Sequence, residues 1–239
     1  MGRKSEIRAN IEQVELEIAK ALERCGRKRS EITLIAVTKN FPISDIEILY
    51  ELGLRDFGEN RDQEARVKFQ EFLQYLGGDR QQVNWHFQGQ LQRNKLASIS
   101  AWADLVHSID DAKYLKGLSE GARERARQID GLIQISLDEE PAPGRGGTDL
   151  AGAIDILSTY ERYRSELSGI ALVGLMGVAP LGVAPERAFA KLAEIFAELR
   201  AEFPSLQILS AGMSGDFIEA IIAGATHLRI GSSILGSRL

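Results

Sequence analysis

The sequence has very few of the residues that build disulfides and metal sites. It contains one cysteine, Cys25, and three histidines among 239 residues. A single cysteine excludes a disulfide framework and a cysteine-based metal site, and no His-x-x-x-His spacing suggests a histidine-based one. Cys25 lies beside Gly26 at a predicted helix end, so we interpret it as an inert thiol. With 44% hydrophobic residues, the chain has enough apolar material for a full core instead.

Other absences narrow the class of protein. No stretch is apolar over the length of a membrane span, and residues 1–8 have no apolar signal core. The net charge of -5 gives no support to nucleic acid or an anionic membrane as a partner. No Gly-x-Gly-x-x-Gly turn follows the first predicted strand, and the serine-hydrolase elbow and the P-loop motif are missing. We therefore expect a cytoplasmic protein.

Apolar and amphipathic segments alternate along the chain. Residues 5–25 have apolar positions at helical spacing, which predicts a leading helix. Apolar runs such as 170–176 are typical of strands that are buried on both faces, as in parallel sheets. The pattern predicts strands at 32–38, 55–58, 84–87, 104–107, 131–137, 171–176, 207–211 and 227–230. Further helices are predicted near 44–52, 60–76, 92–100, 110–128, 149–166, 185–203 and 215–223.

Eight strands with seven intervening helices predict an α/β fold, a closed (β/α)8 TIM-type barrel forming one domain over residues 1–239 with an extra N-terminal helix. A doubly wound open sheet is the alternative. The helix expected after the eighth strand is missing, and the leading helix can pack over the gap. The longest loop, 138–148, contains prolines and glycines that exclude a helix, and it is either a lid or an ordinary surface loop.

Polar residues at the C-terminal ends of the strands are the candidates for chemistry, because active sites of such barrels lie there. They are Thr38, Lys39, Glu59, Asn60, His86, His107, Ser108, Ser136, Met176, Ser210, Met213, Ser214, Arg229, Gly231 and Ser232. Lys39 closes an apolar strand, and since burial disfavours a cation we expect its pKa to be lowered. A neutral amine can form a Schiff base with an aldehyde. The alternative is a strand-end lysine that reaches solvent.

The region near the C-terminus has the features of a phosphate site. Residues 212–214 precede a predicted helix, so Ser214 can cap that helix while free amides point at an oxyanion. Gly231 allows close approach of the backbone, and Ser232 and Ser233 add donors. Loops after the seventh and eighth strands are the common phosphate position in barrels. Two ordinary capped turns are the alternative, but an amine together with a phosphate site suggests pyridoxal 5'-phosphate.

Arg229 lies inside the last predicted strand, where a permanent charge needs a partner. We interpret it as facing the pyridine nitrogen of the cofactor, where a cation disfavours ring protonation and weakens the ring as an electron sink. A salt bridge with a carboxylate of the barrel is the alternative. His86 and His107 are strand-end histidines, for which a hydrogen-bonded structural role is the default reading.

Seven segments in order are similar to one known family. They are 36–39, 57–60, 85–95, 106–110, 174–176, 212–216 and 229–236. On these segments the chain resembles the pyridoxal phosphate homeostasis proteins over nearly its whole length. The resemblance implies a barrel like the N-terminal domain of alanine racemase, with pyridoxal phosphate held as a Schiff base on Lys39. It implies a cofactor-binding set of Lys39, Asn60, His86, Met213, Ser214, Arg229, Gly231 and Ser232.

The resemblance further implies a role in buffering or delivering the cofactor and in regulating amino-acid and keto-acid pools, without robust turnover. The implied partners are pyridoxal phosphate and the apoenzymes that depend on it. The chain departs from the family pattern in the loop after the fifth strand, where Arg145 stands in place of the usual lysine. A guanidinium cannot accept a transferred cofactor as an amine can. Gln88 and Gln90 also replace more usual residues, and we expect them to tune the pocket.

An amino-acid racemase is the main alternative function. Two-base racemisation needs an acid/base group on each face of the α carbon of the substrate. Lys39 can supply one, but in alanine racemase the other is a tyrosine from a separate C-terminal domain across a dimer, and we read no such domain here. A barrel enzyme of the aldolase type, with Lys39 as its Schiff base, is a third reading. We therefore expect a monomer with negligible racemisation.

Overall fold

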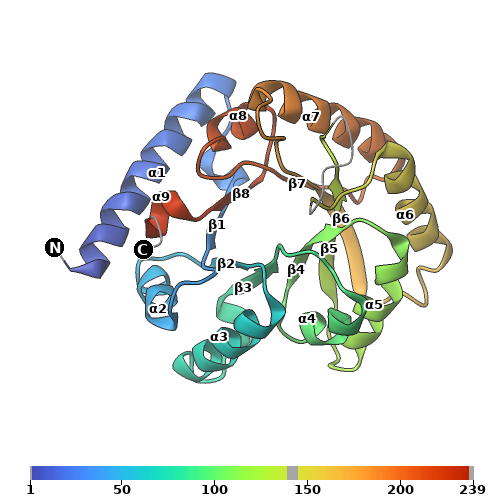
Figure 1. Ribbon diagram of the computed structural model, residues 1–239, viewed down its shortest axis with the longest axis horizontal. Helices are drawn as coiled ribbons and strands as arrows, with labels where there is room; N and C mark the ends of the chain where they lie inside the picture. The colour runs from blue at the N-terminus through green and yellow to red at the C-terminus, as the bar shows by residue number, and fades with distance from the viewer. Residues whose placement is uncertain (1, 139–144, 237–239) are drawn as a thin grey trace.

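The strands of the computed structural model, which describes residues 2–138 and 145–236, close into a barrel (Figure 1). Each strand pairs in parallel with its sequence neighbour, and β1 closes the ring against β8. The strands are β1 Thr33–Val37, β2 Asp56–Glu59, β3 Asn84–Phe87, β4 Leu105–Ile109, β5 Ile129–Ile135, β6 Ile170–Gly177, β7 Ile208–Ser210 and β8 His227–Ile230. The predicted closed barrel is confirmed. The open-sheet alternative is excluded, because it would leave β1 and β8 without each other as partners.

The helices surround the strands (Figure 1). They are α1 Arg3–Cys25, α2 Ile43–Glu51, α3 Asp62–Tyr75, α4 Leu96–Trp102, α5 Leu115–Arg123, α6 Leu150–Arg162, α7 Pro185–Glu202, α8 Phe217–Ile222 and α9 Ser232–Leu235. Short 3-10 turns lie at Arg29–Glu31, Arg80–Gln82, Arg93–Lys95 and Ala112–Tyr114. Within the two described ranges, no helix combines the length and the apolar character that crossing a membrane requires.

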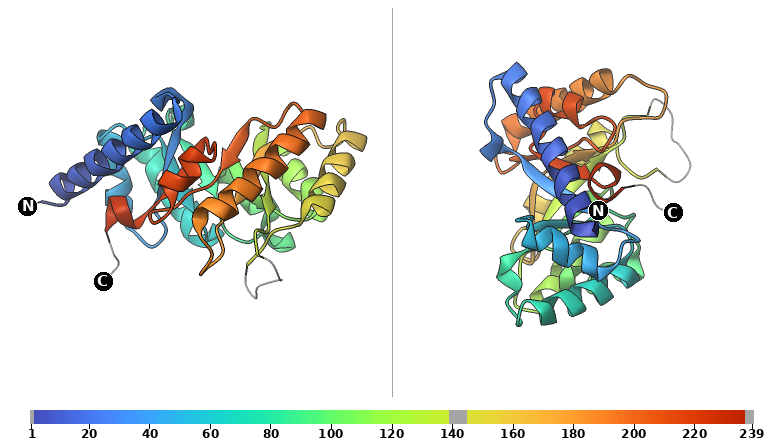
Figure 2. Two further views of the ribbon diagram at one scale, coloured as in Figure 1. Left: turned by 90° about the horizontal axis from the view of Figure 1, so that it is seen from above. Right: turned by 90° about the vertical axis from the view of Figure 1, so that its left-hand side faces the viewer.

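The end of the barrel differs from the expectation in one respect. A helix does follow the eighth strand: α9, a single turn, begins directly after Gly231. The leading helix still packs over this region, because α1 lies against both α8 and α9 (Figure 1; Figure 2). Its buried positions Ile7, Val14 and Ile18 are spaced by seven and four residues, which puts them on one face of the helix. The sequence did not predict this helix because four residues are too few to show a helical pattern of apolar residues.

The core between strands and helices contains a group of large aromatic residues. Phe57 of β2 and Trp85 of β3 point outward and contact Phe72 of α3, with ring centroids 5.7 Å and 6.2 Å from it. Trp102 of α4 stands perpendicular to Trp85 at 6.4 Å. Each of these rings is at most 1% exposed. Truncating one to alanine typically costs about 3–5 kcal/mol, so this group contributes strongly to fixing α3 and α4 on the barrel.

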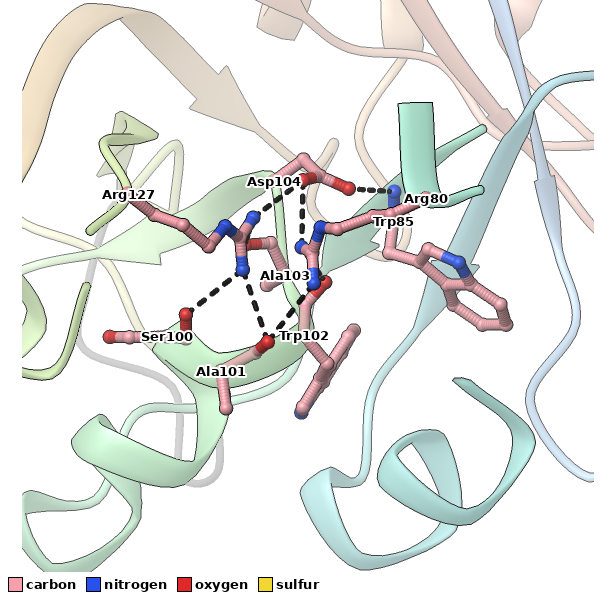
Figure 3. Close-up of polar contacts among 8 residues, drawn as sticks. All are labelled: Arg80, Trp85, Ser100, Ala101, Trp102, Ala103, Asp104 and Arg127. Atoms are coloured by element: carbon pink, nitrogen blue, oxygen red, sulfur yellow. Dashed lines mark hydrogen bonds and ion pairs between the residues drawn. The ribbon is translucent and has the colours of Figure 1, made fainter. Parts of the chain in front are cut away.

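A polar cluster around Asp104, which precedes β4, lies at the N-terminal end of the barrel (Figure 3). Oδ1 of Asp104 accepts hydrogen bonds from Arg80 at 2.8 Å and from Arg127 at 2.6 Å, and Oδ2 accepts one from the backbone of Trp85 at 2.8 Å. The two arginines also donate to carbonyl oxygens at the end of α4, including that of Trp102. Orphan carbonyls at a helix C-terminus are thereby satisfied by cations, which also suit the helix dipole.

The predicted loop 138–148 leaves the barrel after β5 and returns beside it. Its residues 139–144 lie outside the described residues. On the return, Thr148 pairs with the end of β5: its carbonyl accepts from Ser136 at 2.8 Å and its amide donates to Gln134 at 2.9 Å. Gly147 has a φ of 127°, and a Cβ there would lie 2.7 Å from the amide nitrogen of Ser136. The close approach therefore requires glycine.

Candidate functional site

A cavity of about 440 Å³ lies at the C-terminal ends of β1 and β8, on the side of the barrel where such folds place their active sites. Six of the eight predicted cofactor-binding residues line it: Lys39, Met213, Ser214, Arg229, Gly231 and Ser232. The structure thus brings together residues that are nearly 200 positions apart in the chain. The remaining lining residues are Val37, Phe41, Gln88, Gly215 and Gly236.

Lys39 reaches the cavity from a tight turn after β1. The turn is marked by Asn40, whose φ of 62° is left-handed, a region that asparagine tolerates better than most residues. Its amide donates to Oε1 of Glu64 on α3, and the amide of Phe41 donates back to the carbonyl of Thr38 at 3.0 Å. Lys39 itself is partly buried. The expectation of a lowered pKa for its amine stays a prediction.

A buried ion cluster centred on Lys68 stabilises the turn that carries Lys39. Nζ of Lys68 lies 2.8 Å from the carbonyl oxygen of Thr38, 2.9 Å from Oε1 of Glu59 and 2.6 Å from Oε1 of Glu64. Burial raises the pKa of Glu59, and the charge of Lys68 and the hydroxyl of Thr38 oppose that rise. The cluster ties the loop before Lys39 to β2 and α3. Sequence reasoning missed Lys68, because a Glu64–Lys68 pair four residues apart in a helix looks like an ordinary surface pair.

Arg229 enters the cavity from inside the barrel. Nη1 donates to Oγ of Ser210 at 2.6 Å and Nη2 donates to the carbonyl oxygen of Gly177 at 2.9 Å. Neither acceptor is a carboxylate, so these bonds do not form the salt bridge considered as the alternative. Burial lowers the pKa of Arg229 to about 10, and the carboxylate of Asp216 opposes this. The guanidinium therefore remains a cation at neutral pH, and among residues 2–138 and 145–236 no carboxylate forms an ion pair with it.

The two loops that form the predicted phosphate site are linked to each other. Oγ of Ser214 accepts a hydrogen bond from the backbone of Ser233 at 3.2 Å. The expectation that Ser214 caps the following helix is wrong: α8 begins after Asp216, whose Oδ1 accepts from the backbone of Met213 at 2.6 Å. Gly212 has a φ of 90°, and a Cβ there would lie 2.7 Å from that of Ala220. Glycine is thus required for the loop to pass α8.

Two of the predicted residues, Asn60 and His86, do not line this cavity in the described structure. Asn60 lines a larger neighbouring cavity of about 740 Å³ between α3 and α4, which Lys39 does not reach. His86 lies in the barrel interior, where its two ring nitrogens are each 3.0 Å from a partner, Nε2 of His107 and Oδ1 of Asp56. The ring of His86 is therefore occupied by structural hydrogen bonds. The proposed contact of either residue with the cofactor stays a prediction.

Gln88 is the site residue that sequence reasoning undervalued. It lines the 440 Å³ cavity and also an adjoining cavity of about 240 Å³. Its Nε2 is buried and has no hydrogen-bond partner within residues 2–138 and 145–236. A Cβ on Gly58 would lie 2.5 Å from this nitrogen, so the side chain rests on a glycine of β2. Its position directly after β3 was the available signal, because strand-end residues face the mouth of the barrel.

Arg145, which stands where relatives usually have a lysine, is anchored in the adjoining cavity. Its Nε is 3.0 Å from Oδ2 of Asp138, and Nη2 donates to the carbonyl oxygens of Val178 and Ala179 at 3.0 and 3.1 Å. The guanidinium joins the loop after β5 to the loop after β6. In the described part of the chain, no group of three or more histidine, cysteine or acidic side chains is arranged to hold a metal ion.

Comparison with known proteins places this barrel in a family. Residues 10–238 match the family model of the alanine racemase N-terminal domain. Over 241 residues the chain is 35% identical to the pyridoxal phosphate homeostasis protein of Escherichia coli, covering 98% of this chain and 97% of that protein. The Mycobacterium tuberculosis protein of the same name is 36% identical over 246 residues, covering 99% and 94%. This chain belongs to the pyridoxal phosphate homeostasis protein family.

Several solved structures share the architecture. PipY of Synechococcus elongatus, solved with pyridoxal phosphate bound, matches with a TM-score of 0.77 and 31% identity over 96% of this chain and all of that chain. A protein of Bifidobacterium adolescentis matches with a TM-score of 0.86 and 28% identity over 97% and 95%. An alanine racemase of Clostridium difficile is 12% identical with a TM-score of 0.71 and is covered over 57% of its length, which shows a shared barrel fold alone.

Proposed function

We propose that this chain binds pyridoxal 5'-phosphate, joined covalently to Lys39, and acts in the homeostasis of that cofactor. The observation that carries the proposal is the meeting of the amine of Lys39, the guanidinium of Arg229 and the loops of Ser214 and Gly231 around one cavity. Support comes from family relatives that carry this function in their names and from PipY, which was solved with the cofactor. The larger 740 Å³ cavity is also lined by lysines, Lys68 and Lys95, but Nζ of Lys68 is hydrogen-bonded to Glu59 and Glu64, and Nζ of Lys95 lies 4.0 Å from Oδ2 of Asp62.

The residues present fit the cofactor in size and charge. A volume of about 440 Å³ falls in the range of roughly 300–1,000 Å³ that is typical of small-molecule sites. A phosphate dianion would be offset by the buried cation of Arg229 and bound by Ser214, Gly231 and Ser232. A Cβ on Gly231 would lie 3.4 Å from the backbone oxygen of Val37, while one on Gly215 would meet nothing within 4 Å. The loop backbone is thus open toward the cavity at Gly215.

Bound pyridoxal phosphate supplies an aldehyde that condenses with amines and a pyridine ring that withdraws electrons. In our proposal Arg229 faces the ring nitrogen. Arginine can only donate hydrogen bonds and keeps its charge, so it favours the unprotonated ring nitrogen, which is the weaker electron sink. Arg229 therefore suits binding of the cofactor better than chemistry at the α carbon of an amino acid.

The lining of the cavity also favours a binding protein over a racemase. Of the described residues that line it, only Lys39 and Arg229 have ionisable side chains, and arginine keeps its proton at neutral pH. Racemisation by two bases needs a second such group on the opposite face. We propose that the protein instead buffers the cofactor and delivers it to dependent apoenzymes, as a monomer in the cytoplasm.

The test is the visible absorbance of the purified protein with added pyridoxal phosphate, followed by borohydride reduction and peptide mapping. We expect a cofactor band in the wild type and in Lys116→Ala, a control lysine whose side chain is 80% exposed, but not in Lys39→Ala. The reduced label should map to Lys39. Absence of both band and label in the wild type would overturn the binding proposal. Rapid interconversion of D- and L-alanine that depends on Lys39 would favour the racemase.

A further inference from the structure

A continuous chain of hydrogen bonds runs through the barrel interior beneath Arg229. From Oγ of Ser210, which Arg229 contacts at 2.6 Å, it continues 3.0 Å to Nδ1 of His107. Nε2 of His107 lies 3.0 Å from Nδ1 of His86, and Nε2 of His86 lies 3.0 Å from Oδ1 of Asp56. These residues come from β8, β7, β4, β3 and β2. The chain starts at the cavity and ends at the first residue of β2, at the opposite end of the barrel.

The interior members of this chain are shielded from water. Ser210 and His107 are fully buried, and His86 and Arg229 are 2% and 5% exposed. In such surroundings hydrogen bonds are strengthened and unpaired polar atoms are costly, so each member depends on its neighbours. Asp56, whose side chain is 20% exposed, is the one member that touches water to an appreciable extent.

When both histidines are neutral, the two end groups determine the direction of every hydrogen bond between them. Arginine only donates, so Ser210 accepts from Arg229; when His107 is neutral with its proton on Nε2, its Nδ1 can only accept, so the Ser210 hydroxyl donates to it. A neutral His107 then carries its proton on Nε2 and donates it to Nδ1 of His86. His86 in turn carries its proton on Nε2 and donates it to Asp56, since an ionised carboxylate only accepts. All the bonds thus point from Arg229 toward Asp56.

The electrostatics of His107 agree with this assignment. Burial lowers the pKa of His107 well below its usual value, and the nearby cation of Arg229 lowers it further. Burial acts to raise the pKa of Asp56, but the hydrogen bonds from His86 and Asn84 outweigh that effect and lower it. His227, whose ring centroid lies 6.5 Å from that of His86, has its own partner in the hydroxyl of Thr226.

We propose that His86 and His107 are positioning residues, a neutral pair with both protons on Nε2 that holds Ser210 as an acceptor and so aims Arg229 into the cavity. Neither histidine touches the cofactor in this scheme; both act through Ser210. Only the identity of the ligand rests on the proposed function. The direction of the hydrogen bonds is a property of the protein alone and can be tested without any cofactor.

The competing arrangement is defined by one extra proton. If His86 were an imidazolium, it would donate both to Asp56 and to Nε2 of His107. His107 would then be protonated on Nδ1 and would donate to Ser210. The hydroxyl of Ser210 would accept from both sides, and its own proton would need a different acceptor. The tautomer of His107 therefore distinguishes the two arrangements.

Long-range proton–nitrogen NMR of the ¹⁵N-labelled protein at neutral pH reads these tautomers directly. The chain has three histidines, so three imidazole patterns are expected, and His86→Gln, His107→Gln and His227→Gln assign them. We expect His86 and His107 both neutral with the proton on Nε2. A pattern with His107 protonated on Nδ1, or His86 protonated on both nitrogens, would overturn the proposal whether or not the protein binds pyridoxal phosphate.

A second measurement tests the aiming of Arg229, using the dissociation constant for pyridoxal phosphate of folded variants. His107→Leu breaks the chain, whereas His107→Gln retains one acceptor and one donor. We expect affinity to fall about tenfold in His107→Leu, as for loss of one net hydrogen bond, with His107→Gln closer to the wild type. Equal affinities in all three would reject the positioning role. A wild type that binds no cofactor would reject the proposed function and leave the NMR test standing.

Discussion

The two ends of the barrel handle buried polar groups in opposite ways. At the N-terminal end, both carboxylate oxygens of Asp104 are hydrogen-bonded, to Arg80, Arg127 and the backbone of Trp85 (Figure 3). At the C-terminal end lie the three buried side-chain atoms that lack a partner within the described residues. They are Oε2 of Glu59, Oδ1 of Asn60 and Nε2 of Gln88. Polar residues close the structure at one end, and at the other they leave hydrogen-bonding capacity for a ligand.

The arginines of the two ends show the same contrast. Arg127 is paired with Asp104 at 2.6 Å, whereas the hydrogen-bond acceptors of Arg229 are a hydroxyl and a carbonyl. A buried cation without a paired carboxylate is costly unless another anion compensates it. A bound phosphorylated ligand would supply that negative charge. The difference indicates that the C-terminal end is built for a ligand and the N-terminal end for stability.

The largest effect should come from removing the cation at the ligand end. Arg229→Leu deletes a charged donor from the cavity, and we expect the affinity for pyridoxal phosphate to fall about a hundredfold, as for loss of a charge-assisted hydrogen bond. Arg127→Leu is the matched control at the other end and should lower stability while keeping the affinity. Equilibrium titration with pyridoxal phosphate, followed by absorbance, measures the affinity of both variants. Equal losses of affinity in the two variants would show that the two arginines do not differ in their role in ligand binding.

We expect low pH to destabilise the folded protein through His227, which begins β8 at the N-terminal end of the barrel. Burial lowers the pKa of His227 to about 4, helped by the nearby cation of Arg229, although Asp56 opposes the shift. The unfolded chain takes up this proton near its ordinary pKa of about 6.5 and the folded chain only near 4. Between these pH values the unfolded state binds more protons, so stability falls as pH falls, by up to about 3 kcal/mol.

Urea unfolding at pH 7 and pH 4.5 measures this loss, with His227→Gln as the control that lacks the titrating group. The difference in unfolding free energy between the two pH values should be smaller in His227→Gln than in the wild type. An identical pH dependence in both proteins would show that His227 does not contribute.

Removing the carboxylate of Asp104 should lower stability without changing the affinity for pyridoxal phosphate. Asp104→Ala leaves Arg80 and Arg127 without their shared carboxylate and frees the backbone of Trp85. Because the carboxylate is about a quarter exposed, we expect a loss of about 2–3 kcal/mol, below that of a fully buried pair. Thermal or urea unfolding measures it, and the affinity for pyridoxal phosphate should not change. A large loss of affinity with intact stability would contradict the division between the ends.

The smallest effect on stability is expected at Gln88. Gln88→Leu removes a buried donor that has no partner among the residues that the structure describes, so the free energy of unfolding should change by less than about 1 kcal/mol in either direction. Affinity for pyridoxal phosphate or for a small molecule in the adjoining cavity should fall instead, since the donor faces both. A destabilisation as large as that of Asp104→Ala would show that Nε2 is satisfied in the folded protein.

The fold was largely predictable because its signals are local. Each of the eight predicted strands is present, with ends that differ by at most two residues, since apolar runs and the turns between them are read from a few neighbouring positions. The gathering of Lys39 and Arg229 was also predictable, because the strands of such a barrel all end on one side. The predicted capping by Ser214 was wrong, because α8 begins only after Asp216 and Oγ of Ser214 accepts from the backbone of Ser233 instead.

The side-chain contacts inside the barrel could not be predicted from local sequence patterns. Whether a strand residue points inward depends on strand register, and its partners come from other strands. His107 and Ser210 are 103 positions apart, yet their side chains lie 3.0 Å apart. The order of strands and helices, and the end of the barrel that carries the site, were determined by the sequence through local periodicity. Which polar atoms meet inside it, and so where Arg229 is aimed, was decided only by the closing of β1 against β8.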